Sequence, residues 1–126
     1  MKSRGNNRPK VLLLEEAHRS APVVEVLTRA DFEVIQAQDS AEALATLEAR
    51  EDVDVLVADI DLPYGMKGVE LGRYVHDRWP GLGLVMTSNQ VRHLRPDEVP
   101  GHGCFMPRPI PAHTLLEEIR LAVYRP

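Results

Sequence analysis

Apolar residues gather in five short runs, and each run has the length of a strand. The third run ends on the carboxylate of Asp59, and Pro63 cannot extend it further. Runs rich in Val and Leu are typical of central strands in a parallel sheet that is covered on both faces. The runs are Val11–Leu14, Phe32–Ile35, Val53–Ala58, Leu82–Met86 and Cys104–Met106.

Between these runs, apolar residues recur with the period of a helix. Prolines and glycines at 96, 100, 101 and 103 leave room for only a short or irregular helix before the last strand. Alternating strands and helices predict an α/β fold, a doubly wound parallel sheet with helices on both faces. The predicted helices run from about Ser20 to Arg29, from an N-cap at Ser40, through Leu71 and Val75, and from Pro111 through Leu115, Ile119 and Val123.

The composition predicts one soluble domain. The 126 residues suit a single core, and we expect a mobile basic tail over 1–9 and one domain over 10–126. The net charge of -4 disfavours nucleic-acid binding, and no stretch has the length of a membrane span. The lone Cys104 cannot form an internal disulfide, and no signal peptide opens the chain. The expected location is therefore the cytoplasm.

Polar side chains follow four of the five predicted strands. The carboxyl ends of parallel strands lie at one edge of the sheet, where ligands bind in open α/β folds. We therefore expect these side chains to share a site. They are Glu15 and Glu16 after the first strand, Asp59 and Asp61 after the third, Thr87 and Ser88 after the fourth, and Arg108 after the fifth.

This arrangement resembles the receiver domain of response regulators, over almost the whole chain from Lys10 to Tyr124. The matching features are the acidic pair, Asp59, Pro63 and Gly68 in the next loop, the hydroxyl after the fourth strand, and Arg108-Pro109. The resemblance implies a flavodoxin-like sheet with the strand order 2-1-3-4-5. It also implies two-component signalling, in which an aspartate takes a phosphoryl group from a histidine kinase or a phosphotransfer protein.

In that family, the position of Asp59 is the phosphoacceptor. A divalent cation would offset the negative charges of acceptor and phosphoryl group, and Mg²⁺ prefers hard oxygen ligands. By resemblance, Glu16 and Asp59 supply side-chain oxygens to Mg²⁺ and Asp61 supplies its backbone carbonyl. Glu15 would hold a metal-bound water.

Three further residues take roles from the resemblance. Thr87 matches the switch hydroxyl, which hydrogen-bonds the phosphoryl group once it arrives, and Phe105 matches the switch aromatic. Arg108 stands where the family has a lysine that contacts phosphate. Its planar guanidinium binds differently from an ammonium on a flexible stem. The sequence also departs from the family in having Glu16 in place of Asp, and in a loop from Pro63 to Gly68 that is one residue longer.

Each residue also has a plainer interpretation. Glu15 and Glu16 are compatible with solvated charges at a strand end, and Thr87 or Ser88 with a cap for the short helix. Arg108 is compatible with a permanent partner of the acidic cluster that neutralises it without sensing phosphate. The plain interpretation of Phe105 is a core residue.

The leading hypothesis is a stand-alone receiver that accepts phosphate on Asp59 and signals to an unknown downstream protein by contact. One alternative is a receiver-like interaction module that works without phosphorylation, held in one state by Arg108. Another is a small phosphatase of the haloacid-dehalogenase type, with Asp59 as nucleophile and Asp61 as general acid. The usual output face of the family, around residues 92–103, is expected to be atypical. Receivers often self-associate through this face, so a homodimer stays open.

Overall fold

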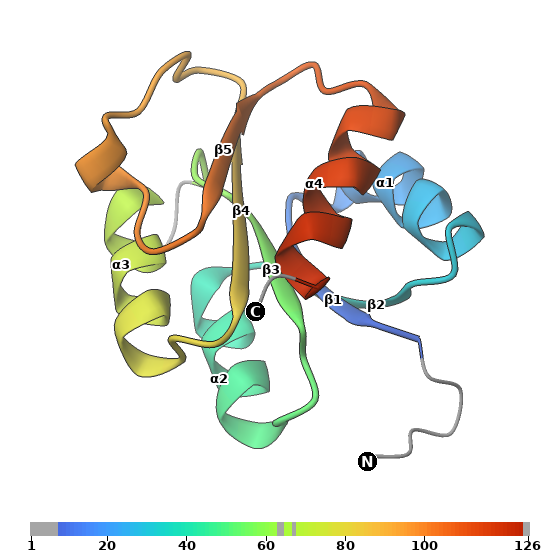
Figure 1. The fold of residues 1–126 in the computed structure, drawn as a ribbon, viewed down its shortest axis with the longest axis horizontal. Coiled ribbons are helices and arrows are strands. Elements are labelled where there is room, and N and C mark those ends of the chain that lie inside the picture. Colours follow the sequence, from blue (N-terminus) through green and yellow to red (C-terminus); the bar gives the residue numbers. More distant parts are fainter. Residues whose placement is uncertain (1–7, 63–64, 67, 125–126) are drawn as a thin grey trace.

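The computed structural model describes residues 8–62, 65–66 and 68–124 and shows one parallel sheet of five strands, in the order β2-β1-β3-β4-β5 (Figure 1). The predicted doubly wound α/β fold and its strand order are confirmed. The strands are β1 (Lys10–Leu14), β2 (Glu33–Ala37), β3 (Val55–Asp59), β4 (Gly83–Ser88) and β5 (Cys104–Pro107). The helices are α1 (Ala17–Arg29), α2 (Ser40–Ala49), α3 (Gly68–Arg78) and α4 (Ala112–Tyr124), with a short 3-10 helix η1 (Pro96–Glu98).

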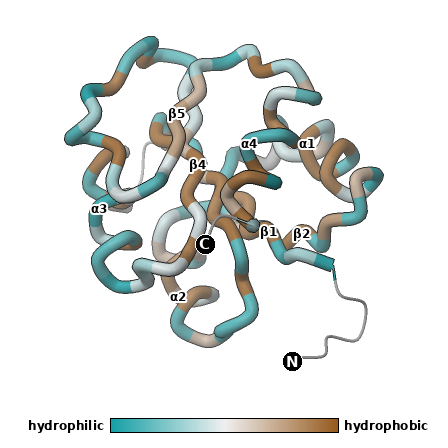
Figure 2. The backbone as a smooth tube through the Cα atoms, in the orientation of Figure 1, coloured by the Kyte–Doolittle hydropathy of each residue, from teal (hydrophilic) through white to brown (hydrophobic). Residues whose placement is uncertain are grey.

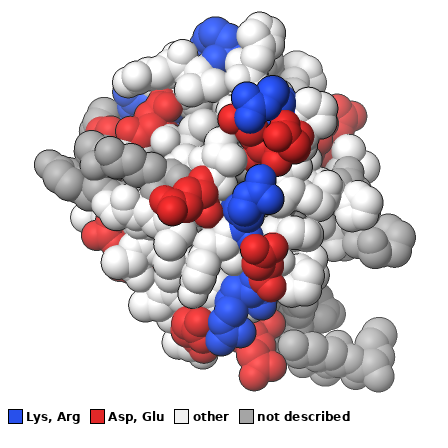
Figure 3. All heavy atoms as spheres, turned by 90° about the vertical axis from the view of Figure 1, so that its left-hand side faces the viewer, with Lys and Arg blue, Asp and Glu red and all other residues white. Residues whose placement is uncertain are grey.

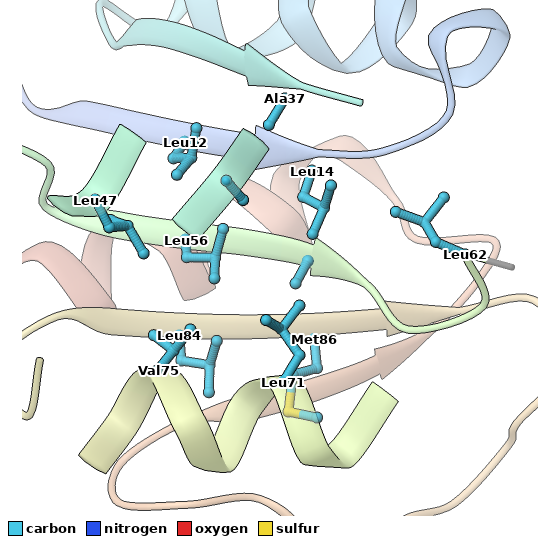
Figure 4. Close-up of a cluster of buried hydrophobic side chains, with 12 residues drawn as sticks. Leu12, Leu14, Ala37, Leu47, Leu56, Leu62, Leu71, Val75, Leu84 and Met86 are labelled. Carbon is cyan, nitrogen blue, oxygen red and sulfur yellow. The ribbon is translucent and has the colours of Figure 1, made fainter. Parts of the chain in front are cut away.

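Two hydrophobic layers hold the helices on the sheet, because successive strand side chains point to opposite faces. On one face, Leu47 of α2 and Leu71 of α3 pack with Leu56 of β3 (Figure 4). On the other face, α1 and α4 pack on the alternate strand positions. Figure 2 shows the hydrophobic residues concentrated along the central strands and the hydrophilic ones along the outer loops. The sheet is therefore buried on both sides, which makes its carboxyl edge a rigid base for a site.

Helix α1 begins earlier than the predicted start near Ser20. The backbone N–H groups of Arg19 and Ser20 both donate to the carbonyl of Glu16, at 2.9 and 3.1 Å, so the first turn forms directly after the strand-end acids. Pro22 consequently lies inside the helix and not in its first turn.

Helix α2 has a different N-cap from the predicted one. The side chain of Asp39 accepts a hydrogen bond from the N–H of Glu42 at 2.8 Å, which makes Asp39 the cap. The hydroxyl of Ser40 is buried and accepts from the N–H of Met66 at 2.9 Å. The prediction of Ser40 as the cap was therefore wrong, because that hydroxyl holds the loop between β3 and α3.

Other boundaries shift by one or two residues. Phe32 precedes β2 and is buried below it, while Asp59, Thr87 and Ser88 are the last residues of their strands. Pro111 lies just before α4, where its carbonyl accepts the N–H groups of the first turn. None of these shifts changes which side chains reach the carboxyl edge.

Residues 89–103, called the 89–103 segment below, connect β4 to β5 without an α-helix. Only η1 is helical there, so the predicted short or irregular helix is confirmed. Leu94 and Val99 pack against the core, and the guanidinium of Arg73 donates to the carbonyl of Asp97 at 2.9 Å. The segment is thus attached to α3 and the sheet by a few contacts.

The face at the left of Figure 1 includes α3 and η1, and basic and acidic side chains alternate over it (Figure 3). Arg95 pairs with Asp97 at 3.2 Å, and Arg78 of α3 pairs with Glu48 of α2 at 3.0 Å. Among the described residues on this face, therefore, no patch of a single sign is present. In the described ranges, no helix is long and apolar enough to cross a membrane. Of the tail predicted over 1–9, residues 1–7 lie outside the described residues, as do the loop residues Pro63, Tyr64 and Lys67. Pro9 is described, and its carbonyl accepts from the N–H of Glu33 at 2.9 Å.

Candidate functional site

The register of the sheet brings the predicted site residues to one edge. Leu14 lies opposite Ala58, so Glu15 follows β1 beside the end of β3, and Asp59 lies opposite Thr87. On the far side of β4, Ser88 lies opposite Pro107, so Arg108 follows β5 next to it. Neighbouring strands in a sheet lie about 4.8 Å apart, which places these side chains within contact distance.

One guanidinium nitrogen of Arg108 contacts three of these residues. Its Nη2 donates to Glu15 Oε2 at 3.1 Å and to Thr87 Oγ1 at 2.8 Å, and it lies 3.3 Å from Asp59 Oδ2. The side chains of Glu15, Asp59 and Arg108 are 6%, 1% and 13% exposed, so the cluster is largely shielded from water. In a shielded site, pairing of this kind lowers the cost of burying charge.

Two buried polar atoms of this cluster have no hydrogen-bond partner among the described residues. They are Oε1 of Glu15 and Nη1 of Arg108. Buried polar atoms are normally satisfied, so each is a position where a ligand or an ion finds a partner. A guanidinium nitrogen selects an anion, and a carboxylate oxygen selects a cation or a water.

Burial raises the pKa of the Glu15 carboxyl above its usual value. The charge of Arg108 opposes this shift, and the nearby charge of Asp59 adds to it. Arg108 therefore offsets only part of the cost of holding two carboxylates together in a shielded place.

The second carboxylate after β3, that of Asp61, is hydrogen-bonded to the end of β4 and the residue after it. Its Oδ1 accepts from the hydroxyl of Ser88 and its Oδ2 accepts from the N–H of Asn89, each at 2.6 Å. The backbone N–H of Asp61 donates to Asp59 Oδ1 at 2.8 Å. Both side-chain oxygens of Asp61 are thus engaged, which gives no support to a general-acid role in a phosphatase.

The donor set fits Mg²⁺ in chemical type. Mg²⁺ takes one or two protein carboxylates and keeps several waters, and here Asp59 and Glu15 offer hard oxygens, one of them the unpartnered Oε1. Within the described ranges, no group of three or more His, Cys, Asp or Glu side chains is arranged to hold a metal. A Mg²⁺ site at this edge would therefore have few carboxylate ligands. The guanidinium of Arg108 would compete with the ion for the oxygens of Glu15 and Asp59.

Besides Asp61, two predicted residues have no contact with Arg108 among those described above. Glu16 is half-buried and forms the N-terminal end of α1 with its backbone. Phe105 lies opposite Met86 in the sheet and packs against the core. Their proposed roles as metal ligand and switch aromatic stay predictions.

Sequence reasoning missed the bonds that Asp61 makes. The sequence predicts Ser88 only as a strand-end hydroxyl or a cap, and it predicts no role for Asn89. The hydroxyl of Ser88 accepts from the N–H groups of Gln90 and Val91, at 3.0 and 2.8 Å, as a cap does, although no helix follows. A second hydroxyl directly after Thr87 was the available signal, but its partner could not be read from spacing.

The sequence model of the response regulator receiver domain matches residues 11–119, most of the chain. The chain belongs to the response regulator receiver family. Its class is therefore two-component signalling, and members of the family generally signal and bind Mg²⁺, with histidine kinases as their general partners. No match was found among curated proteins.

Solved structures agree with this fold. A response regulator receiver domain protein from Clostridium thermocellum superposes with a TM-score of 0.82 at 20% identity, covering 93% of this chain and 95% of that chain. A response regulator receiver protein from Sinorhizobium medicae gives 0.81 at 20% identity, covering 94% and 97%. The Vibrio cholerae chemotaxis protein CheY4 gives 0.77 at 24% identity, covering 91% and 98%. These likenesses show the shared receiver fold.

Proposed function

We propose that this receiver domain accepts a phosphoryl group on Asp59 from a histidine kinase or phosphotransfer protein, and signals by contact with a downstream protein. The observation that carries the proposal is the unpartnered Nη1 of Arg108, a buried donor on the guanidinium whose other terminal nitrogen, Nη2, lies 3.3 Å from Asp59 Oδ2. A buried guanidinium donor without a partner is suited to a phosphoryl oxygen.

In the proposed transfer, an oxygen of Asp59 forms a bond to phosphorus while the phosphorus–nitrogen bond of the donor histidine breaks. The electron pair of the broken bond returns to the imidazole. Asp59 Oδ1 is held by the N–H of Asp61, so Oδ2, which faces Arg108, is the oxygen better placed to attack. Arg108 then has the charge and the free N–H groups to bind the phosphoryl oxygens.

The residues that would hold Mg²⁺ are Glu16 and Asp59 through their carboxylates and Asp61 through its carbonyl, with Glu15 Oε1 available to a metal-bound water. When bound, the ion offsets the negative charge of the acceptor and the transferring group. Thr87, which accepts from Arg108 at 2.8 Å in the resting structure, would turn its hydroxyl to the phosphoryl group.

The test is intact mass after incubation with Mg²⁺ and a small phosphodonor. Wild type should gain the mass of one phosphoryl group and Asp59→Asn should gain none. Asp77→Asn, which alters an exposed aspartate on α3, is the matched control and should be modified like wild type. An unmodified wild type, or an equally modified Asp59→Asn, would contradict the proposal.

A second candidate function follows from the same cluster. Because Nη2 of Arg108 already contacts Glu15, Asp59 and Thr87, it is able to hold the domain in one state without phosphate. The protein would then be a phosphorylation-independent interaction module. In that case its binding to a partner protein should be the same with and without phosphodonor, and the same for Asp59→Asn.

A further inference from the structure

Asp61 contacts the acceptor with its backbone and the 89–103 segment with its side chain. Its N–H donates to Asp59 Oδ1 at 2.8 Å, while its carboxylate accepts from Ser88 Oγ and from the N–H of Asn89, both at 2.6 Å. Hydrogen bonds to a carboxylate at such short distances are among the stronger ones in proteins. The orientation of Asp61 is therefore fixed from the side of β4.

Ser88 is the centre of this arrangement. Its side chain is fully buried, and its hydroxyl donates to Asp61 and accepts from the N–H groups of Gln90 and Val91. Its carbonyl accepts from the N–H of Arg108 at 2.7 Å. One residue thus touches the acceptor loop, the start of the 89–103 segment and the residue that carries the site's guanidinium.

We propose that Ser88, acting through Asp61, is a positioning residue for the acceptor carboxylate of Asp59. The hydroxyl fixes the carboxylate of Asp61, and this fixes the N–H that holds Asp59 Oδ1 and leaves Oδ2 for attack. The proposal rests on the phosphoacceptor function proposed above and gives it a means of regulation. We call Ser88 and Asp61 the hydroxyl bridge.

The bridge also couples the acceptor to the 89–103 segment. Phosphorylation converts the carboxylate of Asp59 into an acyl phosphate, which accepts more weakly from the N–H of Asp61 and adds negative charge near the carboxylate of Asp61. The bonds from Ser88 and Asn89 then change with it. Because coupling between two sites is reciprocal, a protein that binds the segment would change the free energy of phosphorylating Asp59 by the same amount that phosphorylation changes its binding.

A helix cap alone would not need Asp61. Capping the turn after β4 takes only the hydroxyl of Ser88 and the N–H groups of Gln90 and Val91. The carboxylate of Asp61 is partly withdrawn from water, and this costs free energy unless its hydrogen bonds offset the loss. The N–H of Asp61 therefore distinguishes the two roles. If Ser88 only caps the turn, loss of its hydroxyl leaves this N–H unaffected. If Ser88 positions Asp61, loss of the hydroxyl exposes it.

The first experiment measures hydrogen exchange of single amides by NMR in the unphosphorylated protein. In Ser88→Ala, the amide of Asp61 should exchange on the order of tenfold faster, together with those of Gln90 and Val91. Ser88→Thr, which keeps the hydroxyl, should restore protection of the Asp61 amide. Thr46→Ala removes a hydroxyl on α2 and should leave all three amides unchanged.

Asp61→Ala is the second variant, in case Ser88→Ala does not fold, and the buried strand amide of Leu56 reports folding in both. In Asp61→Ala, the amides at position 61 and of Val91 should exchange faster, as in Ser88→Ala. If the amide at 61 keeps its protection in a folded Ser88→Ala or Asp61→Ala protein, the bridge does not position the acceptor and the proposal fails.

The second experiment compares exchange at Gln90 and Val91 before and after modification with Mg²⁺ and a small phosphodonor. Modified wild type should lose protection there, and Asp59→Asn treated alike should not. If wild type takes up no phosphate, the proposed function fails while the amide of Asp61 still tests the bridge. If it is modified without change at Gln90 and Val91, the coupling is refuted.

Discussion

Nη2 of Arg108 lies 3.3 Å from Oδ2 of Asp59, on the side of the carboxylate that its other contacts leave open. The same nitrogen contacts Glu15, so one guanidinium charge lies between two buried carboxyl groups. Removing one partner from such a group leaves uncompensated buried charge, which costs more than the pairing itself contributes.

Arg108→Ala should therefore destabilise the protein by about 3 kcal/mol, measured by urea denaturation at neutral pH. Arg29→Ala is the matched control, since Arg29 pairs with Glu25 at 3.0 Å in a bond that is largely exposed, and it should cost at most about 0.5 kcal/mol. Equal losses in the two variants would show that the Arg108 cluster carries no special stability.

Arg108 also competes with a metal for the same oxygens. Arg108→Met should bind Mg²⁺ on the order of tenfold more tightly than wild type, because a fixed positive charge beside a divalent ion is repelled by it. Titration calorimetry measures this directly. Arg78→Met, which alters an exposed ion pair with Glu48, should leave the affinity unchanged. An unchanged or weaker affinity in Arg108→Met would show that the guanidinium and the ion do not share ligands.

Glu15 should make stability depend on pH. Its pKa is raised in the folded state, chiefly by burial, so the folded protein binds a proton at a pH where the unfolded chain does not. The free energy of unfolding should then rise as the pH falls from neutral through the raised pKa toward the unfolded value of about 4.5.

Glu15→Gln removes this proton uptake. The stability of wild type relative to Glu15→Gln should increase toward acid, in thermal unfolding scans run in metal-free buffer across that range. A difference between the two proteins that stays constant with pH would mean that Glu15 titrates normally in the folded state.

Gly65→Ala should destabilise the protein by roughly 1–3 kcal/mol, because Gly65 has a φ of 80° and a Cβ there would meet the hydroxyl of Ser40. That hydroxyl holds the loop through Met66. Gly81→Ala is the control, since a Cβ at Gly81 meets nothing within 4 Å, and its effect should stay within about 0.5 kcal/mol. Chemical denaturation of both variants checks the difference.

The alternation of apolar runs and helical spacing was enough to predict the sheet, because buried strands and amphipathic helices leave strong periodic signals. The strand-end residues Asp59, Thr87 and Arg108 followed from the parallel topology, which brings such ends together. The predicted helix starts were less accurate. The cap at Asp39 and the early start of α1 depend on single hydrogen bonds that spacing does not specify.

The partners within the site could not be predicted in the same way. Which oxygen of Asp61 meets Ser88, and which nitrogen of Arg108 stays without a partner, depends on side-chain orientations set by packing. The sequence showed that an arginine and an acidic cluster would meet. The contact of one nitrogen with Glu15, Asp59 and Thr87 together is a property of the folded geometry alone.

Because no α-helix connects β4 to β5, the 89–103 segment can vary in length and sequence without changing the sheet. Both ends of the 89–103 segment are fixed by β4 and β5, which pair with each other in the sheet, so their separation does not depend on the residues between them. Lengthening such a loop costs only about 0.6 kcal/mol per doubling. The segment is therefore a place where relatives of this protein can gain, lose or exchange recognition sequences while the sheet beneath stays the same.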